Sequence, residues 1–433
     1  MAPALPCHGD PEALQGGAAP LAALELRSEE CVASPLRRQF MVTHARSLAC
    51  LLTCLLPMLT ACGGGTRASA APDAAPAAVQ KAADAAVARG LVGVTLYHLS
   101  GSETTAARAG LRQAGSAAPI EAGDPFLIGS TTKAMTAALA ARVVEQGRIA
   151  WTTTLAEALP ELAAGMRPEY RPVTLAQLLD HRGGVLAMNN GADTERFQAA
   201  LESSTTPLPT TLAGRERYFA AWLLAQAPVA APGQGFAYSN GGYVLAALML
   251  QARTGRTYAD LFAQELARPL GLTVSWTSDD VTFTQRPVGH SGAKGQLTAL
   301  APLDADSAAW LTVLRPGGVG TTVTPASYAT WVGWHLRALQ GTATPLAASY
   351  VRRLQSLQAG DYALGWIAAD VDGRPVLAHD GEYRGFSSMV AIDARGRSAS
   401  FGFTNTEADD GTWTLASMNQ ALLDIERALP PAP

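Results

Sequence analysis

Hydrophobic and polar positions follow two different periods along the chain, and the period changes near both ends. Alternating, β-branched or aromatic segments indicate strands close to each terminus. They are 91–99 (LVGVTLYHL), 362–371 (YALGWIAADV), 374–381 (RPVLAHDG), 386–394 (FSSMVAIDA) and 398–405 (SASFGFTN). From about 134 to 345 the apolar spacing is mostly helical, and helices are also expected over 77–90 and 414–429. The pattern predicts an α+β fold with one mainly antiparallel sheet built from both chain ends and flanked by helices.

The predicted globular region covers about residues 79–430, with a mostly helical lobe inserted at about 145–325. Its length favours one large domain of two lobes, or two domains. Residues 62–78 have a low-complexity composition with no apolar face, so a flexible tether is expected there.

The segment before the tether has the pattern of an export signal. From Met41 a short basic head precedes an apolar run at 48–59, which is shorter than the roughly 20 residues that span a bilayer. Leu59, Thr60, Ala61 and Cys62 resemble a bacterial lipobox, which implies cleavage before Cys62 and its lipidation. An ordinary cleaved signal or a weak anchor is the alternative. Residues 1–40 lie upstream of this signal, so translation is expected to start at Met41.

These features predict an exported bacterial lipoprotein on the periplasmic side of a membrane, the outer membrane if the cell has one. All five cysteines lie at or before Cys62, so thiol catalysis and cysteine-bound zinc are excluded from the mature region. The net charge of −4 provides no basic patch for phosphates, and nucleic acid is not an expected partner.

Lysine usage points to one position. The chain has 29 arginines but lysine only at Lys81, Lys133 and Lys294. Ser130 and Lys133 stand three apart at the start of an expected helix, so both side chains project from one face of its first turn. A serine nucleophile needs a base, and a buried lysine can lose its proton near neutral pH whereas arginine cannot. The simpler interpretation makes Ser130 a helix cap and Lys133 a surface residue.

The same SxxK spacing occurs a second time, at Ser291 and Lys294. That copy lies among Gly289, Gly292 and Gly295 and precedes no helical pattern, so its side chains have no reason to share a face. The first copy is followed by AMTAALAARVVEQG, which is apolar on nearly all sides and ends at Gly147, as expected for a buried helix.

Two further motifs follow in order along the chain. Tyr238 and Asn240 stand two apart in GQGFAYSN, so in an extended segment both face the same way. His379, Asp380 and Gly381 lie in LAHDGEYRGFSS near the C-terminus, although HxG also occurs at His181 and His290.

SxxK, YxN and HxG in this order resemble the serine β-lactamase-like superfamily of class C β-lactamases, DD-peptidases and related esterases. The resemblance extends over nearly the whole globular region and includes GSTTKAMTA, LPEL, VTLAQLLDHRGGV, PGQGFAYSNGGY, ARPLGL, YALGW, HDGEYRGFSSMVAID and FGFTN. It implies an acyl-serine hydrolase with Ser130 as nucleophile, Lys133 as its base and Tyr238 as proton shuttle. Asn240 would contact Lys133 and the substrate. His379 stands where many members have the lysine of a Lys-Thr-Gly triplet and would also bind the substrate.

The resemblance further implies that Asp380 and Gly381 border the substrate and that the backbone amides of Ser130 and Glu382 form the oxyanion hole. Neither a metal nor an organic cofactor is needed. Asp380 stands where members of the superfamily usually have a serine or threonine, and Glu382 stands where they often have a smaller residue. Both replacements add negative charge. A hydrolase of esters, amides or cell-wall peptides is therefore favoured over β-lactamase or D-alanyl-D-alanine carboxypeptidase activity in particular. Tyr243 and Trp366 are expected in the core, and His181 and Gly183 at a helix end.

Two alternatives remain. Residues 289–293 (GHSGA) form a degenerate GxSxG motif that could pair Ser291 with His379, although the final glycine and the alternating strand and helix pattern are missing. The chain could also be a non-catalytic relative that binds a cell-wall or acyl ligand at the same place.

Overall fold

The computed structural model describes residues 74–189, 191–276, 286–409 and 411–429. The expected signal segment, Cys62 and the tether up to residue 73 lie outside these ranges. Helix α2 begins at Ala74, so residues 74–78 are helical and not part of a tether as the sequence pattern predicted. Alanine favours a helix, and Ala75 and Ala78 pack against the core.

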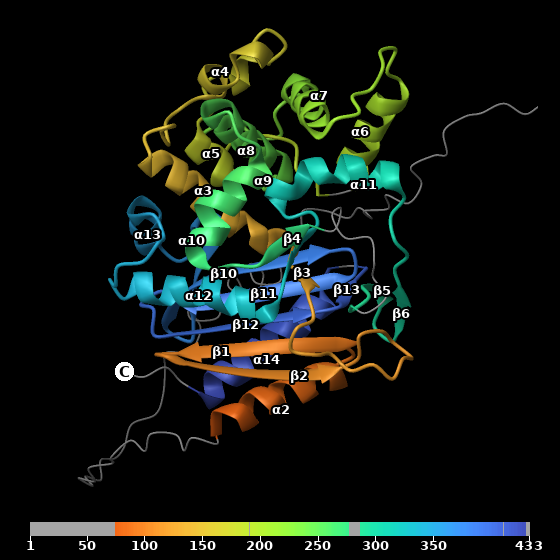
Figure 1. Ribbon diagram of the computed structural model, residues 1–433, viewed down its shortest axis with the longest axis vertical. Helices are drawn as coiled ribbons and strands as arrows, with labels where there is room; N and C mark the ends of the chain where they lie inside the picture. Colours follow the sequence, from red (N-terminus) through yellow and green to blue (C-terminus); the bar gives the residue numbers. More distant parts are fainter. Residues whose placement is uncertain (1–73, 190, 277–285, 410, 430–433) are drawn as a thin grey trace, which may run out of the picture.

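A seven-stranded antiparallel sheet forms the centre of the fold, in the order β2-β1-β12-β11-β10-β9-β8. Strands β1 and β2 come from the N-terminal end of the described chain and the other five from the C-terminal end. The α+β prediction with one sheet built from both ends is therefore confirmed (Figure 1). The strands of this sheet are β1 Gly93–Ser100, β2 Glu103–Gly110, β8 Tyr362–Ala363, β9 Trp366–Val371, β10 Arg374–Tyr383, β11 Phe386–Asp393 and β12 Ser398–Thr404.

Two small sheets lie beside it, in the orders β3-β7-β4 and β13-β5-β6. Their strands are β3 Phe126–Leu127, β4 Val274–Trp276, β5 His290–Ala293, β6 Gln296–Ala299, β7 Thr321–Val323 and β13 Thr406–Ala408.

Helices cover both faces of the central sheet. Helices α2 (Ala74–Ala88) and α14 (Trp413–Ala428) pack together on one face over a small core that includes Val79 and Met418. Helix α12 (Pro325–Leu339) and the start of α3 (Thr132–Glu145) lie on the other face, below the helical lobe (Figure 1). The larger core therefore fills the space between the sheet and the lobe.

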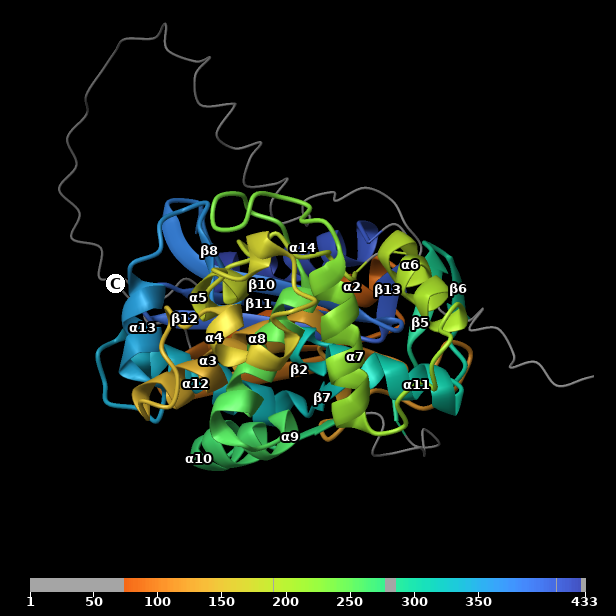
Figure 2. The ribbon, with the colours of Figure 1, turned by 90° about the horizontal axis from the view of Figure 1, so that it is seen from above.

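The helical lobe surrounds α8 (Asn240–Thr254), in which every residue from Asn240 to Leu250 is buried. Figure 2 shows the lobe from above, with α4, α5 and α7 around α8. Its other helices are α4 Leu155–Ala158, η2 Pro160–Leu162, η3 Pro168–Tyr170, α5 Leu175–Leu179, α6 Gly191–Glu202, α7 Leu212–Ala225, α9 Tyr258–Leu261, η4 Phe262–Ala267, α10 Arg268–Leu270, α11 Ala305–Leu311 and η6 Thr312–Gly317. Helix α13 (Ala348–Gln355) packs on α3 beside this lobe. Tyr243 and Trp366 are fully buried, as predicted. Within the described ranges, no helix combines the length and apolar character needed to cross a membrane.

Candidate active site

Ser130 lies where the sheet meets the helical lobe. It belongs to a one-turn 3-10 helix, η1 (Gly129–Thr131), and not to the first turn of α3 as the sequence predicted. The cause is Gly129, which has a φ of 49° and lies directly against the backbone of β10. A Cβ at Gly129 would be 2.6 Å from Glu382 N, a distance that excludes any side chain there.

A second glycine makes the same contact from the other side. A Cβ at Gly381 would lie 2.6 Å from Ser130 N and 2.3 Å from Ile128 O. The two glycines therefore let η1 and β10 touch, and the backbone amides of Ser130 and Glu382, the expected oxyanion donors, come from the two touching segments. Ser130 itself is only partly buried, so its hydroxyl is reachable.

Lys133 is fully buried in the first turn of α3, which excludes its interpretation as a surface residue. Its Nζ lies 2.9 Å from Ser130 Oγ, and it donates to Asn240 Oδ1 and to the carbonyl of Gly317, both at 2.6 Å. Asn240 Nδ2 donates to the Met188 carbonyl at 3.0 Å, and this bond fixes which end of the amide faces the lysine.

This environment favours a neutral amine. Burial lowers the pKa of Lys133 well below its ordinary value, and the negative charge of Asp380 offsets the effect only in part. A neutral amine has two N–H bonds and one lone pair. Asn240 Oδ1 and Gly317 O can only accept, so they take the two N–H bonds and the lone pair is left for the Ser130 hydroxyl.

Tyr238 lies over the same amine. Its ring centroid is 4.6 Å from Lys133 Nζ, and its hydroxyl is hydrogen-bonded to the Ser130 side chain. Burial raises the pKa of Tyr238 above its ordinary value, with the Ser130 hydrogen bond as a smaller opposing effect. The phenol is therefore protonated at neutral pH and can donate a proton.

The HxG segment lies on β10, just beyond the point where the strand loses one neighbour. Strand β9 pairs with β10 only as far as Ala378, whereas β11 pairs with it up to Tyr383. The His379 side chain is buried, with Nε2 3.3 Å from the Tyr362 hydroxyl and Nδ1 2.5 Å from the Asp380 carbonyl. Burial lowers the pKa of His379 to about 4, so its ring is neutral.

Asp380 and Glu382 occupy different surroundings. The Asp380 side chain is 12% exposed, and its charge acts on both Lys133 and Tyr238. The Glu382 carboxylate accepts a hydrogen bond from Ser387 Oγ at 3.3 Å, so it is tied to β11. Of the two acidic departures from the usual pattern, Asp380 is the one whose charge raises the pKa values of Lys133 and Tyr238.

Three residues contribute to this arrangement in ways that the sequence did not predict: Gly317, His181 and Tyr362. Gly317 contributes its backbone carbonyl, which no side-chain motif can reveal. The two adjacent glycines in RPGGVG were the only sequence feature that pointed to this position. His181 ends α5 with a φ of 57°, as its predicted place at a helix end requires. Its bonds to the Tyr238 segment and to Tyr362 depend on tertiary contacts that no local pattern reveals.

Comparison with known proteins identifies the family of this chain. A sequence model of the β-lactamase family matches residues 79–424. The chain belongs to the β-lactamase family. It has the fold of this superfamily and is a serine hydrolase.

Individual members of the family are distant. Penicillin-binding protein 4 of Amycolatopsis lactamdurans is 26% identical over 304 residues, covering 65% of this chain and 72% of its own. An unguisins hydrolase of Aspergillus campestris is 23% identical over 281 residues, and the match covers 62% of this chain but only half of the fungal protein. The solved structure of the D-amino acid amidase of Ochrobactrum anthropi SV3 has a TM-score of 0.64 and 20% identity, covering 82% of this chain and 97% of the amidase.

The second SxxK copy has none of the family's site geometry. Ser291 lies in the β5–β6 hairpin, where its Oγ donates to Asp409 at 3.1 Å, and Lys294 is exposed at the turn. The nucleophile-elbow alternative is therefore wrong, because that motif requires a turn from a strand into a helix.

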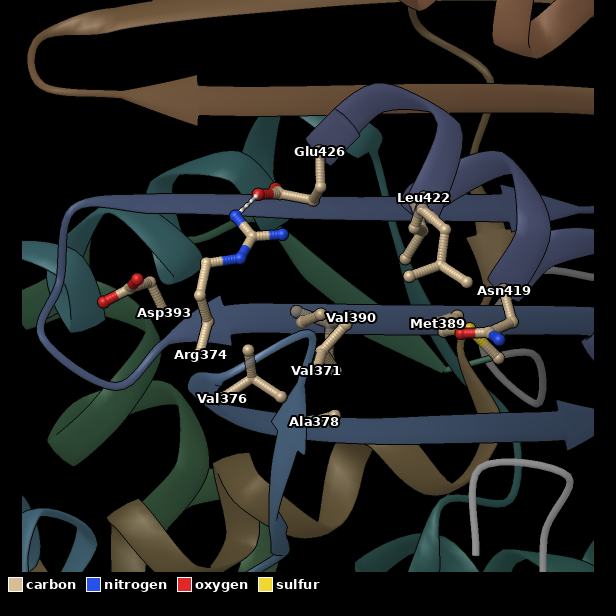
Figure 3. A pocket seen from close by; sticks show the side chains of 12 residues that line it. Val371, Arg374, Val376, Ala378, Met389, Val390, Asp393, Asn419, Leu422 and Glu426 are labelled. Atoms are coloured by element: carbon tan, nitrogen blue, oxygen red, sulfur yellow. Dashed lines mark hydrogen bonds and ion pairs between the residues drawn. The ribbon is translucent and has the colours of Figure 1, made fainter. Parts of the chain in front are cut away.

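A small pocket on the far side of the sheet is separate from this site. It lies between α14 and strands β9 to β11, with Arg374 and Glu426 paired at its edge and Leu422 and Met389 among its apolar lining (Figure 3). Its volume of about 40 Å³ suffices for a few water molecules and is far below that of a ligand site.

Proposed function

We propose that this β-lactamase-family protein hydrolyses an ester or amide through an acyl-enzyme at Ser130, with neutral Lys133 as base and Tyr238 as proton donor. The observation that carries the proposal is the environment of Lys133. Two obligate acceptors occupy both N–H bonds of the neutral amine, so its lone pair is available to the nucleophile. The raised pKa of Tyr238 favours the phenol as donor over a phenolate as base.

In the acylation step Ser130 Oγ forms a bond to the substrate carbonyl carbon, and its proton passes to Lys133 Nζ. The amides of Ser130 and Glu382 donate to the resulting oxyanion. The bond from carbon to the leaving oxygen or nitrogen then breaks, and Tyr238 gives that atom its proton. Tyr238 recovers a proton from the Lys133 ammonium, 4.6 Å from its ring centroid.

Deacylation repeats these transfers with water in place of the leaving group. Water adds to the acyl carbon as its proton passes to the neutral Lys133. The bond between Ser130 Oγ and carbon breaks, Oγ takes the proton from the Lys133 ammonium 2.9 Å away, and the acid product leaves. Acyl transfer through Ser130, Lys133 and Tyr238 therefore requires no group that the chain lacks.

We also propose a substrate class. Asp380 places a negative charge close enough to Lys133 and Tyr238 to shift both pKa values. Two like charges about 4 Å apart repel by about 4 kcal/mol at an effective dielectric constant of 20, and partial exposure reduces this value. Neutral esters and amides, or substrates with a free amine, are therefore favoured at least tenfold over substrates with a carboxylate beside the scissile bond.

A substrate panel tests both proposals. One sample of the residue 74–433 fragment is assayed with p-nitrophenyl acetate, D-phenylalanine amide, nitrocefin and a D-Ala-D-Ala peptide, and a separate sample is labelled with a fluorophosphonate. We expect label on Ser130, loss of label in Ser130→Ala, and full labelling in the matched control Ser291→Ala. A wild type without label or turnover would support a non-catalytic, ligand-binding role.

Substitution of Asp380 tests the substrate class separately. Asp380→Thr restores the hydroxyl that related enzymes have, and it is expected to raise kcat/KM for nitrocefin and the D-Ala-D-Ala peptide about tenfold relative to the neutral ester. Efficient nitrocefin hydrolysis by the wild type, unchanged in Asp380→Thr, would contradict the preference and favour the β-lactamase alternative.

We further propose that the mature protein is a lipoprotein that begins at Cys62. Only the sequence supports this proposal: an apolar run at 48–59 ends in Leu-Thr-Ala-Cys. Intact-mass analysis of the membrane fraction is expected to show a lipidated Cys62 as the first residue. A product that starts elsewhere, or tryptic peptides from residues 1–40, would contradict it.

A further inference from the structure

A chain of buried hydrogen bonds connects the two segments on either side of Ser130. His181 Nε2 lies 3.0 Å from the Tyr362 hydroxyl, and the same hydroxyl lies 3.3 Å from His379 Nε2. All three residues are at least 93% buried. They come from the end of α5, from β8 and from β10, which are far apart in sequence. We call these three residues the His181–Tyr362–His379 brace.

Backbone groups at its two ends fix the tautomers of both histidines. The Ser239 N–H donates to His181 Nδ1 at 3.1 Å, so a neutral His181 has its proton on Nε2 and donates to Tyr362. The proton of His379, on Nδ1, goes to the Asp380 carbonyl at 2.5 Å, so its Nε2 is an acceptor. The single Tyr362 proton faces this Nε2 and the hydroxyl of Tyr243, to which Tyr362 is also hydrogen-bonded. One pair of neutral histidine tautomers therefore satisfies the contacts at both ends of the brace.

At one end the brace holds the backbone on both sides of Tyr238. The His181 carbonyl accepts from Ala237 N at 2.7 Å, and its Nδ1 accepts from Ser239 N. The His181 ring also packs on the Tyr238 ring, with centroids 4.2 Å apart. The position of the proposed proton donor is thus set by His181 through three separate contacts.

At the other end the brace holds β10 where β9 no longer pairs with it. His379 is the first residue beyond that pairing, and Asp380, Gly381 and Glu382 follow it directly. Asp180 strengthens the connection, because its carboxylate accepts from Leu364 N at 3.3 Å and pairs with Arg353. The end of α5 is therefore tied to the β8–β9 turn by two adjacent residues.

We propose that His181 and Tyr362 are positioning residues, which act through His379 and Tyr238 to keep the proton donor and the oxyanion strand at a fixed separation. The proposal rests on the proposed function of Ser130 and Tyr238. Displacement of a reacting group by about 1 Å costs on the order of a hundredfold in rate. Because the brace is buried and both ring nitrogens of His379 are bonded within the protein, its loss should lower kcat and leave KM nearly unchanged.

Tyr362→Phe removes only the central hydroxyl. We expect kcat for p-nitrophenyl acetate to fall roughly ten- to hundredfold, with KM within about twofold of wild type. The matched control is Tyr350→Phe. Tyr350 is fully buried, and its hydroxyl lies 3.0 Å from His335 Nε2 and accepts from Trp366 Nε1 at 2.6 Å, so it is a similar tyrosine–histidine pair that contacts none of the proposed catalytic residues. The Tm should fall by a similar amount in both variants, whereas kcat should fall only in Tyr362→Phe.

His181→Asn gives an independent test. Asparagine tolerates a positive φ and its Oδ1 can accept from Ser239 N, but it offers no donor that reaches Tyr362. Its loss of kcat should be at least that of Tyr362→Phe, because the ring contact with Tyr238 is lost as well. The double variant should lose little more than His181→Asn alone, because both changes break the same chain. Two results would contradict the proposed positioning role of the brace. One is a double variant whose loss of kcat, as a free energy, is the sum of the two single losses, and the other is a Tyr362→Phe variant with a lowered Tm but a kcat within twofold of wild type.

The proposed function fails by a different observation. If the wild type shows neither turnover nor fluorophosphonate labelling of Ser130, the hydrolase proposal is wrong. If the wild type is active and the brace variants behave like Tyr350→Phe, only the brace is wrong.

Discussion

The two SxxK copies of this chain have the same spacing and opposite surroundings. Lys133 is fully buried beneath Tyr238, with acceptors on two sides and the Ser130 hydroxyl on the third. Lys294 is exposed at a hairpin turn, and Ser291 bonds to Asp409. A serine and a lysine three residues apart therefore become a nucleophile and a base only where the fold removes water from the amine and supplies acceptors for its protons.

The surroundings of Lys133 come from four separate segments. Gly317 can bring its carbonyl to Nζ because it has no side chain, since a Cβ there would lie 3.0 Å from Asn240 Cβ. Gly365 lies against α3 on the opposite side, where a Cβ would be 2.3 Å from Ala134 N. Glycines at these close approaches let the sheet and the lobe enclose the lysine.

The largest expected effect comes from changing the buried lysine. Lys133→Arg should lower kcat/KM by about 10²- to 10⁴-fold, nearly as much as Lys133→Ala, because the proposed role requires a neutral amine and arginine stays charged. The matched control, Lys294→Arg, changes the exposed copy and should retain wild-type activity. Steady-state kinetics with p-nitrophenyl acetate measure all three variants. Activity retained in Lys133→Arg would make Lys133 an electrostatic residue and remove the functional difference between the two copies.

Much of this arrangement could be predicted from the sequence, for identifiable reasons. The mainly antiparallel sheet built from both chain ends followed from apolar alternation in five segments. The chemistry at Ser130 and Lys133 followed from a lysine retained among arginines and from the order of the SxxK, YxN and HxG motifs along the chain. Strand β2 was missed because it is a mostly exposed edge strand, ETTAARAG, with no apolar alternation. The short β5–β6 hairpin gave no strand pattern for a similar reason.

The site contacts that were missed have a common cause. The Gly317 carbonyl, the His181–Tyr362 bond and the 3-10 turn at Ser130 are determined by which segments the tertiary fold brings together. Every residue has a backbone carbonyl, so the sequence does not show which one contacts the lysine. His181 was identified from the sequence only as part of a helix end. Side-chain motifs can be found in a sequence, whereas the backbone groups and buried partners that tune them require the folded chain.

A smaller effect, on pH dependence, sharpens the contrast between the two lysines. The neutral fraction of Lys133 increases as pH rises through its lowered pKa, so kcat/KM should increase from acid pH and then level off. The raised pKa of Tyr238 keeps the phenol protonated well into the alkaline range, so no matching decline is expected near neutral pH. The profile should therefore have one acidic limb and not a bell shape.

Asp380→Asn identifies the group responsible for that limb. The Asp380 charge raises the pKa of Lys133 against the larger effect of burial, so its removal should lower that pKa further. The acidic limb of kcat/KM for the neutral ester should then move to lower pH, while Lys294→Ala should leave it in place. A titration of kcat/KM from pH 4 to 10 in wild type and both variants measures the shift. A base whose charged form is stabilised by Asp380 must have a lower pKa when that negative charge is lost. An acidic limb that stays fixed in Asp380→Asn, or that moves to higher pH, would therefore assign the limb to a group other than Lys133.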